Sequence, residues 1–269
     1  MQLFFNIFIF AFGLIIGSFL NVVILRLEKG EGLGGRSYCP HCRHQLNWKD
    51  LFPVASFLLL KRKCRYCSQK ISFQYPLVEL ATGLIFLFIV SFQLPSLEFS
   101  IFYFLFSIFW FYVACSLIVI FVYDLKHYLI PDAVLFPAII ITVMYQLMLD
   151  TRFLLFNSLW AALAAFTFFG AIYLISQGRW MGFGDCKLAI FLGLILGFPN
   201  ILAGLFIAFF VGAIVGIALM FLNIPVVKKM NIGLKSELPF APFLIFGTFL
   251  AMFSGDALIQ WYLSLIFGV

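Results

Sequence analysis

The sequence has little charge: 11 Asp and Glu, 17 Lys and Arg and 3 His among 269 residues. Charged residues make up 10% of the chain, against about 25% in an average soluble domain, so the chain cannot cover a water-facing surface. This shortage excludes a soluble enzyme, a disordered regulator and a disulfide-rich secreted module. Hydrophobic residues make up 64%, in unbroken runs of about 20 rather than in the alternation of a β-barrel strand. We expect an all-α polytopic membrane protein.

The apolar runs define the expected membrane spans, because a helix needs about 20 apolar residues to cross a bilayer. The runs cover residues 1–25, 76–94, 99–122, 129–149, 153–176, 187–222 and 239–267. The run 187–222 is too long for one ordinary span, and its Gly197-Phe198-Pro199-Asn200 segment has the composition of a turn, so we split it there. The sequence thus predicts about eight transmembrane helices. Run 239–267 is treated as one span, although a break at Gly255-Asp256 would make it two.

The positive charges support this layout. Every Lys and Arg except Arg152 falls on one side of the predicted membrane: most lie in 26–75, and the others are Lys126, Arg179, Lys187, Lys228, Lys229 and Lys235. Lys and Arg collect on the cytoplasmic side, so we expect four cytoplasmic loops and both termini outside. The net charge of +6 therefore needs no nucleic-acid partner. The first basic residue follows the first apolar run, so 1–25 is expected to be a retained anchor and not a signal peptide.

Three parts are expected: an N-terminal transmembrane anchor (1–25), a small cytoplasmic domain (26–75) and a seven-helix membrane domain (76–269). The cytoplasmic domain holds two Cys-x-x-Cys pairs, Cys39 with Cys42 and Cys64 with Cys67. Four such thiolates fill the tetrahedral coordination of a structural Zn²⁺ ion. Two disulfides or a redox dithiol are the alternatives. A cytoplasmic location disfavours stable disulfides, and doubled pairs are unusual for a redox motif. No repeat of fixed period is expected in the chain.

The other histidines and cysteines are not expected to bind the metal. His41 and His44 lie near the four cysteines, but four thiolates already complete a zinc site, so we expect them to be surface residues. Cys115 and Cys186 lie in or beside spans and are expected to pack.

Asp124 and Asp185 are the candidate catalytic residues. Asp124 follows the third predicted span and Asp185 begins the sixth, so both are expected at the cytoplasmic rim. Two carboxylates that meet at low dielectric share one proton, and one then acts as general base on water while the other polarises a carbonyl. Helix capping, or ion pairing with Lys126 and Lys187, is the alternative for each aspartate.

Four further residues are notable. Gly182 and Gly184 precede Asp185 and are expected to allow a backbone conformation and a close approach that a side chain would block. Asp132, after Pro131, is expected to be structural at a helix N-terminus. Glu79 lies one turn inside the second span, where a carboxylate is either functional or a satisfied packing residue.

These motifs together resemble the bacterial type IV prepilin peptidases, along nearly the whole chain. The resemblance is carried by Gly17-Ser18-Phe19-Leu20-Asn21, Arg26-Leu27, the doubled Cys-x-x-Cys loop, Tyr75-Pro76 through Glu79, Asp124, Leu129-Ile130-Pro131-Asp132, Gly182-x-Gly184-Asp185-x-Lys187 and Pro239-Phe240-Ala241-Pro242-Phe243. It implies that Asp124 and Asp185 are a catalytic dyad of the Gly-x-Gly-Asp type. The reaction implied is cleavage of the leader of type IV prepilins and pseudopilins after a Gly, at the cytoplasmic face of the bacterial inner membrane.

The resemblance also implies a second activity. Family members with the cysteine loop methylate the new N-terminal residue with S-adenosylmethionine, and serve pilus assembly and type II secretion. The residues themselves do not show methyl transfer, and the Gly32-x-Gly34-Gly35 segment is too weak a signal for a nucleotide site. A donor site between the zinc loop and the spans, near Glu79, is the corresponding expectation.

Two other functions compete with this assignment. An intramembrane aspartyl protease of the presenilin and signal-peptide-peptidase type also carries Gly-x-Gly-Asp, but its aspartates should lie deeper and it has no four-cysteine loop. A proton-coupled transporter would place acids near the midplane within paired half-repeats. Here the acidic residues gather at one rim.

Overall fold

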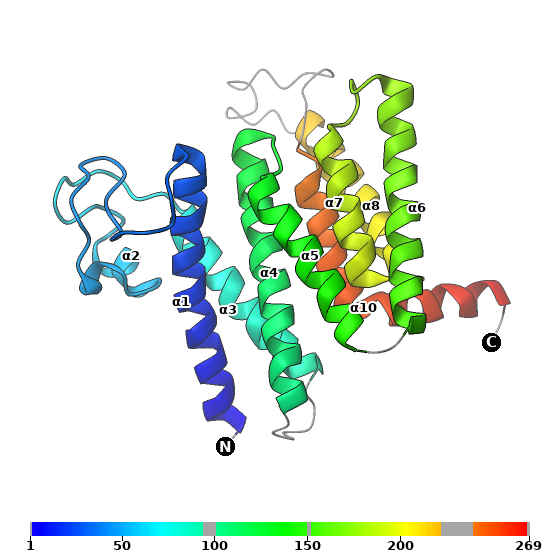
Figure 1. Cartoon of the computed structure of the whole chain (residues 1–269). Coiled ribbons are helices and arrows are strands. Elements are labelled where there is room, and N and C mark those ends of the chain that lie inside the picture. Colours follow the sequence, from blue (N-terminus) through cyan, green and yellow to red (C-terminus); the bar gives the residue numbers. More distant parts are fainter. Residues whose placement is uncertain (1, 94–100, 150–151, 222–238, 268–269) are drawn as a thin grey trace. The chain divides into compact units, whose positions relative to one another are not determined.

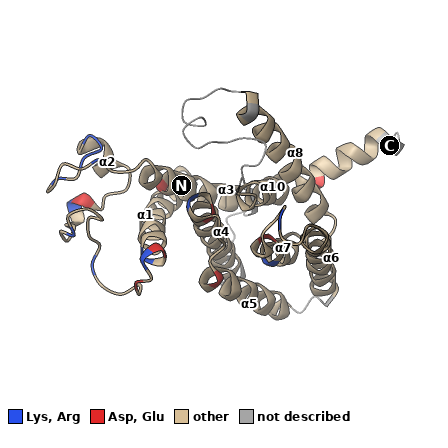
Figure 2. Cartoon of the chain, turned by 90° about the horizontal axis from the view of Figure 1, so that it is seen from above, with Lys and Arg blue, Asp and Glu red and all other residues tan. Residues whose placement is uncertain are grey.

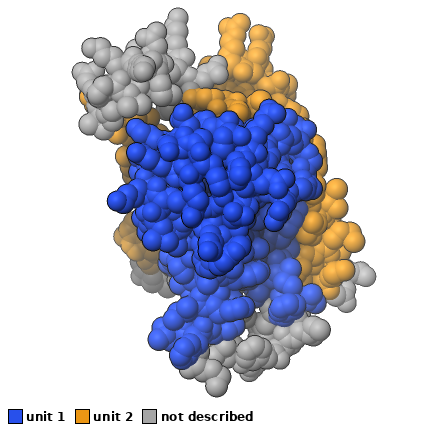
Figure 3. All heavy atoms as spheres, turned by 90° about the vertical axis from the view of Figure 1, so that its left-hand side faces the viewer, with its two compact units in different colours: residues 1–119 blue, residues 120–269 orange. Residues whose placement is uncertain are grey.

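The structure is a computed structural model that describes residues 2–93, 101–149, 152–221 and 239–267. The described residues form two compact units, 1–119 and 120–269 (Figure 3). Their secondary structure is helical, and the only β-pairs among them are two isolated bridges, Tyr38 with Gln45 and Lys63 with Lys70. The all-α class is therefore confirmed.

Eight long helices and two short ones make up the described chain (Figure 1). The long helices are α1 (Gln2–Lys29), α3 (Gln74–Gln93), α4 (Ile101–His127), α5 (Asp132–Met148), α6 (Arg152–Ser176), α7 (Phe183–Leu196), α8 (Asn200–Phe221) and α10 (Ala241–Phe267). The short ones, η1 (Trp48–Asp50) and α2 (Ala55–Leu59), belong to the loop between α1 and α3. Each predicted span thus has its helix.

The eight long helices differ in length. Among the described residues, six are long and apolar enough to cross a membrane, whereas α5 has 17 residues and α7 has 14. At 1.5 Å per residue, α7 extends about 21 Å, short of the roughly 30 Å of a hydrocarbon core. This helix contacts α5, α6, α8 and α10, and its side chains from Leu188 to Leu194 are largely buried. A helix enclosed by protein does not have to match the lipid thickness.

The predicted break after α7 is confirmed. Gly197 ends the helix with φ of 63°, a left-handed conformation that favours glycine. The helix α8 then begins at Asn200. Gly193, inside α7, lies so close to α6 that a Cβ there would come within 2.5 Å of Ala162 Cα, so small residues allow these two helices to touch.

The last apolar run forms one continuous helix, α10, and not two. Figure 1 shows its red C-terminal part running at a steep angle to its orange beginning. Near the proposed break, a Cβ on Gly255 would come within 2.7 Å of Asn200 Oδ1. Gly255 therefore permits close packing between α10 and the start of α8 without ending the helix.

In the first unit, α1 and α3 pack backbone to backbone. A Cβ on Gly13 would come within 2.7 Å of Gly83 Cα, and one on Gly17 within 2.7 Å of Glu79 Cα. Small residues at such crossings let two membrane helices approach closely. This contact fixes the position of Glu79 against α1.

Some expectations stay predictions. The division at 25 and 75 into anchor, cytoplasmic domain and membrane domain, and the side of the membrane on which each loop lies, rest on the sequence alone. The basic residues Lys228, Lys229 and Lys235 lie outside the described residues.

Candidate active site and metal centre

Asp124 lies in the last turn of α4, which continues to His127, beyond the end of the apolar run at 122. It follows the third predicted span, as the sequence indicates, and it is still a helical residue, with 5% of its surface exposed. Its carboxylate accepts a hydrogen bond from the backbone N–H of Ala241, the first residue of α10. Its Oδ2 atom is buried without a hydrogen-bond partner. One carboxylate oxygen of Asp124 thus accepts a hydrogen bond from a helix N-terminus, and the other has no hydrogen-bond donor.

Asp185 lies in the first turn of α7 and is partly buried. It is close enough to Asp124 for the two carboxylate charges to interact. The start of α7, the start of α10 and the end of α4 lie at the same end of the molecule (Figure 1). Residues 61 positions apart in the sequence therefore lie at one end of the molecule, within range of each other's charge. Their action as a catalytic dyad stays a prediction.

The glycines before Asp185 have a narrower role than expected. Gly182 has φ of −74° and ψ of 150°, which any residue adopts, and a Cβ there would meet nothing closer than 3.9 Å. At Gly184 a Cβ would lie 3.3 Å from Ile130 Cδ1. The expectation of an unusual backbone conformation is wrong for these positions. The expected close approach is present at Gly184, where the backbone lies against the side chain of Ile130.

The nearby lysine has another partner. Lys187 Nζ lies 2.5 Å from Asp132 Oδ1, so this ion pair joins α7 to the first turn of α5. Asp132 is thus a structural residue, as expected. The pairing of Lys187 with Asp185, the alternative explanation for that aspartate, is not what the structure shows.

The four cysteines of the loop lie together. Their Sγ atoms are all within 4.8 Å of one another, and Cys39 Sγ lies 3.9 Å from Cys67 Sγ. Four thiolates at about 2.3 Å from a tetrahedral Zn²⁺ ion are about 3.8 Å apart, whereas a disulfide requires about 2.05 Å. All four cysteines are free thiols. The geometry fits a metal ion and not the disulfide alternative.

The two cysteine pairs form a short repeat that the sequence analysis missed. In each pair the N–H of the first cysteine bonds a carbonyl five residues on: Cys39 bonds His44, and Cys64 bonds Gln69. The residue after the second cysteine is left-handed in both, with φ of 57° at Arg43 and at Ser68. One isolated bridge closes each turn, over 38–45 and 63–70. The two segments, 38–45 and 63–70, have the same length and the same placement of Cys-x-x-Cys, and this similarity in the sequence could have predicted the repeat.

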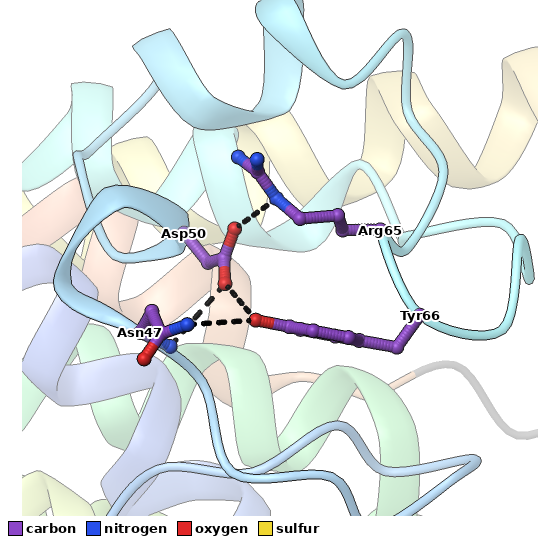
Figure 4. Close-up of polar contacts among 4 residues, drawn as sticks. All are labelled: Asn47, Asp50, Arg65 and Tyr66. Carbon is purple, nitrogen blue, oxygen red and sulfur yellow. Dashed lines mark hydrogen bonds and ion pairs between the residues drawn. The ribbon is translucent and has the colours of Figure 1, made fainter.

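A polar cluster ties the second cysteine turn to the preceding segment (Figure 4). Asp50 accepts hydrogen bonds from Arg65 Nε at 2.8 Å and from the Tyr66 hydroxyl at 3.0 Å. Asn47 Nδ2 donates to the same hydroxyl. Desolvation raises the pKa of the Tyr66 phenol, and the hydrogen bond to Asp50 adds to the shift.

The histidines of the loop lie where they were expected. His44 stacks on the Tyr66 ring at 3.7 Å between centroids, so it links the two cysteine turns through ring contact. His41 is exposed. Neither belongs to the four-thiol cluster.

Glu79 is buried, with 7% of its surface exposed. Its Oε2 accepts the backbone N–H of Val54 at 2.7 Å, and the Ser18 hydroxyl donates a second hydrogen bond. Val54 has φ of 57°, a costly conformation for a β-branched residue. Glu79 therefore holds the loop against α1 and α3, while its role in binding a methyl donor stays a prediction.

Arg26, which the sequence identifies only as part of a family motif, has a structural role. It is 3% exposed, and its guanidinium donates to the carbonyls of Gly32, Gly34, Gly35 and Arg36. The glycine-rich segment is thus wrapped around a cation with its carbonyls inward. A phosphate cradle needs inward N–H groups, so this segment is not arranged as one.

Comparison with known proteins agrees with these observations. Residues 11–93 match the bacterial peptidase A24 N-terminal domain, and residues 111–217 match the type IV leader peptidase family. A prepilin leader peptidase/N-methyltransferase of Bacillus subtilis is 32% identical, over 97% of this chain and 98% of the relative. Proteins of the same name from Aeromonas salmonicida and Pseudomonas aeruginosa are 31% identical (96% of this chain, 94% of the relative) and 28% identical (94% and 91%).

No solved structure matches the chain. The two family models lie in order along one sequence, and full-length relatives exceed 30% identity. The chain is a multi-pass α-helical membrane protein that belongs to the type IV leader peptidase family.

Proposed function

We propose that this protein hydrolyses the leader peptide of type IV prepilins and pseudopilins, with Asp124 and Asp185 as the catalytic pair. The observation that supports the proposal is the placement of two carboxylates, from α4 and α7, within range of each other's charge, one of them with a buried, unpartnered oxygen. The full-length relatives named prepilin leader peptidases supply the substrate class. Cleavage then takes place in the bacterial inner membrane, at its cytoplasmic face.

The two aspartates have different surroundings, and this suggests different roles. Asp124 accepts the Ala241 N–H at the positive end of the α10 dipole, which favours its ionised form. Asp185 then holds the shared proton. In this arrangement Asp124 takes a proton from the attacking water, while Asp185 donates a hydrogen bond to the scissile carbonyl oxygen. Asp124 then gives the proton that it took from water to the leaving amine, and the tetrahedral intermediate collapses as the C–N bond breaks.

We also propose that the four cysteines bind Zn²⁺. The thiolates Cys39, Cys42, Cys64 and Cys67 fill all four positions, so the ion would stabilise the loop and supply no open coordination position for catalysis. Methyl transfer from S-adenosylmethionine is proposed from the names of the relatives alone. Among the described residues, Glu79 already accepts a hydrogen bond from Val54 and the carbonyls of Gly32, Gly34 and Gly35 face Arg26, and we derive no step for this reaction.

The test is incubation of purified protein with a tagged prepilin and S-adenosylmethionine, followed by mass measurement of the product N-terminus. Asp124→Asn and Asp185→Asn should each lower cleavage by at least about 10³-fold, because each removes half of the acid–base pair. Asp132→Asn is the matched control, since it breaks an ion pair near the site and should leave most activity. Retained cleavage in either dyad variant would refute the catalytic assignment.

A further inference from the structure

The helix α2 (Ala55–Leu59) exposes apolar side chains. Leu58 is 67% exposed and Leu59 is 81% exposed. Two aromatic residues of the same loop are exposed as well: Trp48 at 68% and Phe52 at 55%, with ring centroids 6.0 Å apart. A unit surrounded by water would bury such side chains or pair them with another surface.

The position of α2 along the membrane helices explains this exposure. Val54, the residue before α2, bonds Glu79 of α3, and Glu79 contacts Gly17 of α1. The end of α1 at Lys29 lies about 18 Å further along that helix, at 1.5 Å per residue. Figure 1 accordingly shows α2 beside the middle of α1 and not beyond its upper end. Both α1 and α3 are candidate spans, so α2 lies beside segments that are expected in the membrane.

Basic residues border the same segment. Lys61, Arg62 and Lys63 follow α2 directly and are exposed, and Lys49 Nζ lies 5.5 Å from the centroid of the Trp48 ring. Figure 2 shows basic residues on the loops beside α2. Apolar and aromatic side chains next to Lys and Arg are typical of segments that lie in the membrane interface. Each such cation also attracts anionic headgroups.

We propose that α2, with Trp48 and Phe52, inserts into the interface of an anionic bilayer, where Lys49, Lys61, Arg62 and Lys63 contact the headgroups. The zinc loop is then attached to the membrane at its edge as well as through α1 and α3. The partner is the lipid surface on the side of the loop. The hydrophobic stem of a prepilin is the competing occupant, and the charge on this segment favours lipid.

A photo-reactive benzoylphenylalanine in place of Leu59 tests the proposal. The full chain is reconstituted into vesicles of phosphatidylcholine and phosphatidylglycerol, illuminated and analysed by mass spectrometry. Leu33 is the matched control, because it is also exposed (57%) but belongs to the segment wrapped around Arg26, near the far end of α1. Retention of bound zinc shows that the substituted loop is folded.

The proposal predicts lipid adducts at position 59 well above those at position 33. Adducts with phosphatidylglycerol should fall when Lys61 and Lys63 are both replaced by Gln. Equal labelling at positions 59 and 33 would overturn the proposal. So would an added prepilin that replaces lipid as the adduct at position 59, which would identify a substrate surface.

Discussion

Glu79 and Asp124 are both buried acidic residues in membrane helices, yet their surroundings differ. Glu79 has two donors, the Val54 N–H and the Ser18 hydroxyl, and it holds a loop in place. Asp124 has one donor, the Ala241 N–H, and a buried oxygen with no partner. Leaving a buried polar atom unpaired costs about 1–3 kcal/mol.

The difference separates a structural carboxylate from a reactive one. A carboxylate with two donors contributes to stability and has fewer lone pairs left for water or substrate. A buried carboxylate that lacks donors and lies next to a second acid destabilises the fold until a ligand binds. Catalytic groups are often found in such surroundings. Glu79, beside the zinc loop, is a carboxylate with its donors in place, whereas Asp124 lacks a donor on one oxygen.

The largest effect should follow from replacing one of the four cysteines of the zinc loop. Cys64→Ser removes one thiolate from a site of four, and we expect bound zinc to fall from about one ion per chain to almost none. Metal analysis of the purified protein measures this loss. Cys115→Ser is the control, because Cys115 lies in α4, outside the four-thiol cluster, and zinc should be retained. Full zinc occupancy in Cys64→Ser would show that the cluster is not the metal site.

Removing the single donor to Asp124 should have the next largest effect. Ala241→Pro deletes the N–H at the first position of α10, where proline is well tolerated in a helix. A hydrogen bond to a charged group contributes about 1.5–3 kcal/mol, so kcat for prepilin cleavage should fall about 10- to 100-fold with KM little changed. Ala241→Gly keeps the N–H and is the matched control. Equal kcat in the two variants would show that this bond does not assist Asp124.

Much of this arrangement could be predicted from the sequence, because it depends on local patterns. The apolar runs located the helices, the Gly197–Asn200 turn separated α7 from α8, and the Cys-x-x-Cys spacing located the thiol cluster. The helix α4 continues past its apolar run through Asp124 to His127, since hydropathy marks where lipid ends and not where a helix ends.

Other features depend on contacts between distant segments. The bond from Ala241 to Asp124 joins residues 117 positions apart, and the bond from Val54 to Glu79 depends on how a loop folds back on α3. Neither has a periodic signal. The shortness of α7 is likewise explained only by the helices that enclose it, because a run of apolar residues looks the same in lipid and in protein.

The smallest effect should come from weakening the bond to Glu79 without removing it. Glu79→Gln keeps an acceptor oxygen of the same shape but loses its charge, at a cost of about 1–2 kcal/mol. Hydrogen exchange at the Val54 amide should then accelerate about tenfold, while cleavage of prepilin changes little. Val54→Ala is the control. It keeps the N–H and removes the β-branched side chain, so it shows how much of the change in exchange comes from the left-handed conformation of residue 54. If Glu79→Gln instead abolishes methylation and leaves Val54 protected, Glu79 belongs to the methyl-donor site, and the contrast with Asp124 becomes one between two reactive carboxylates.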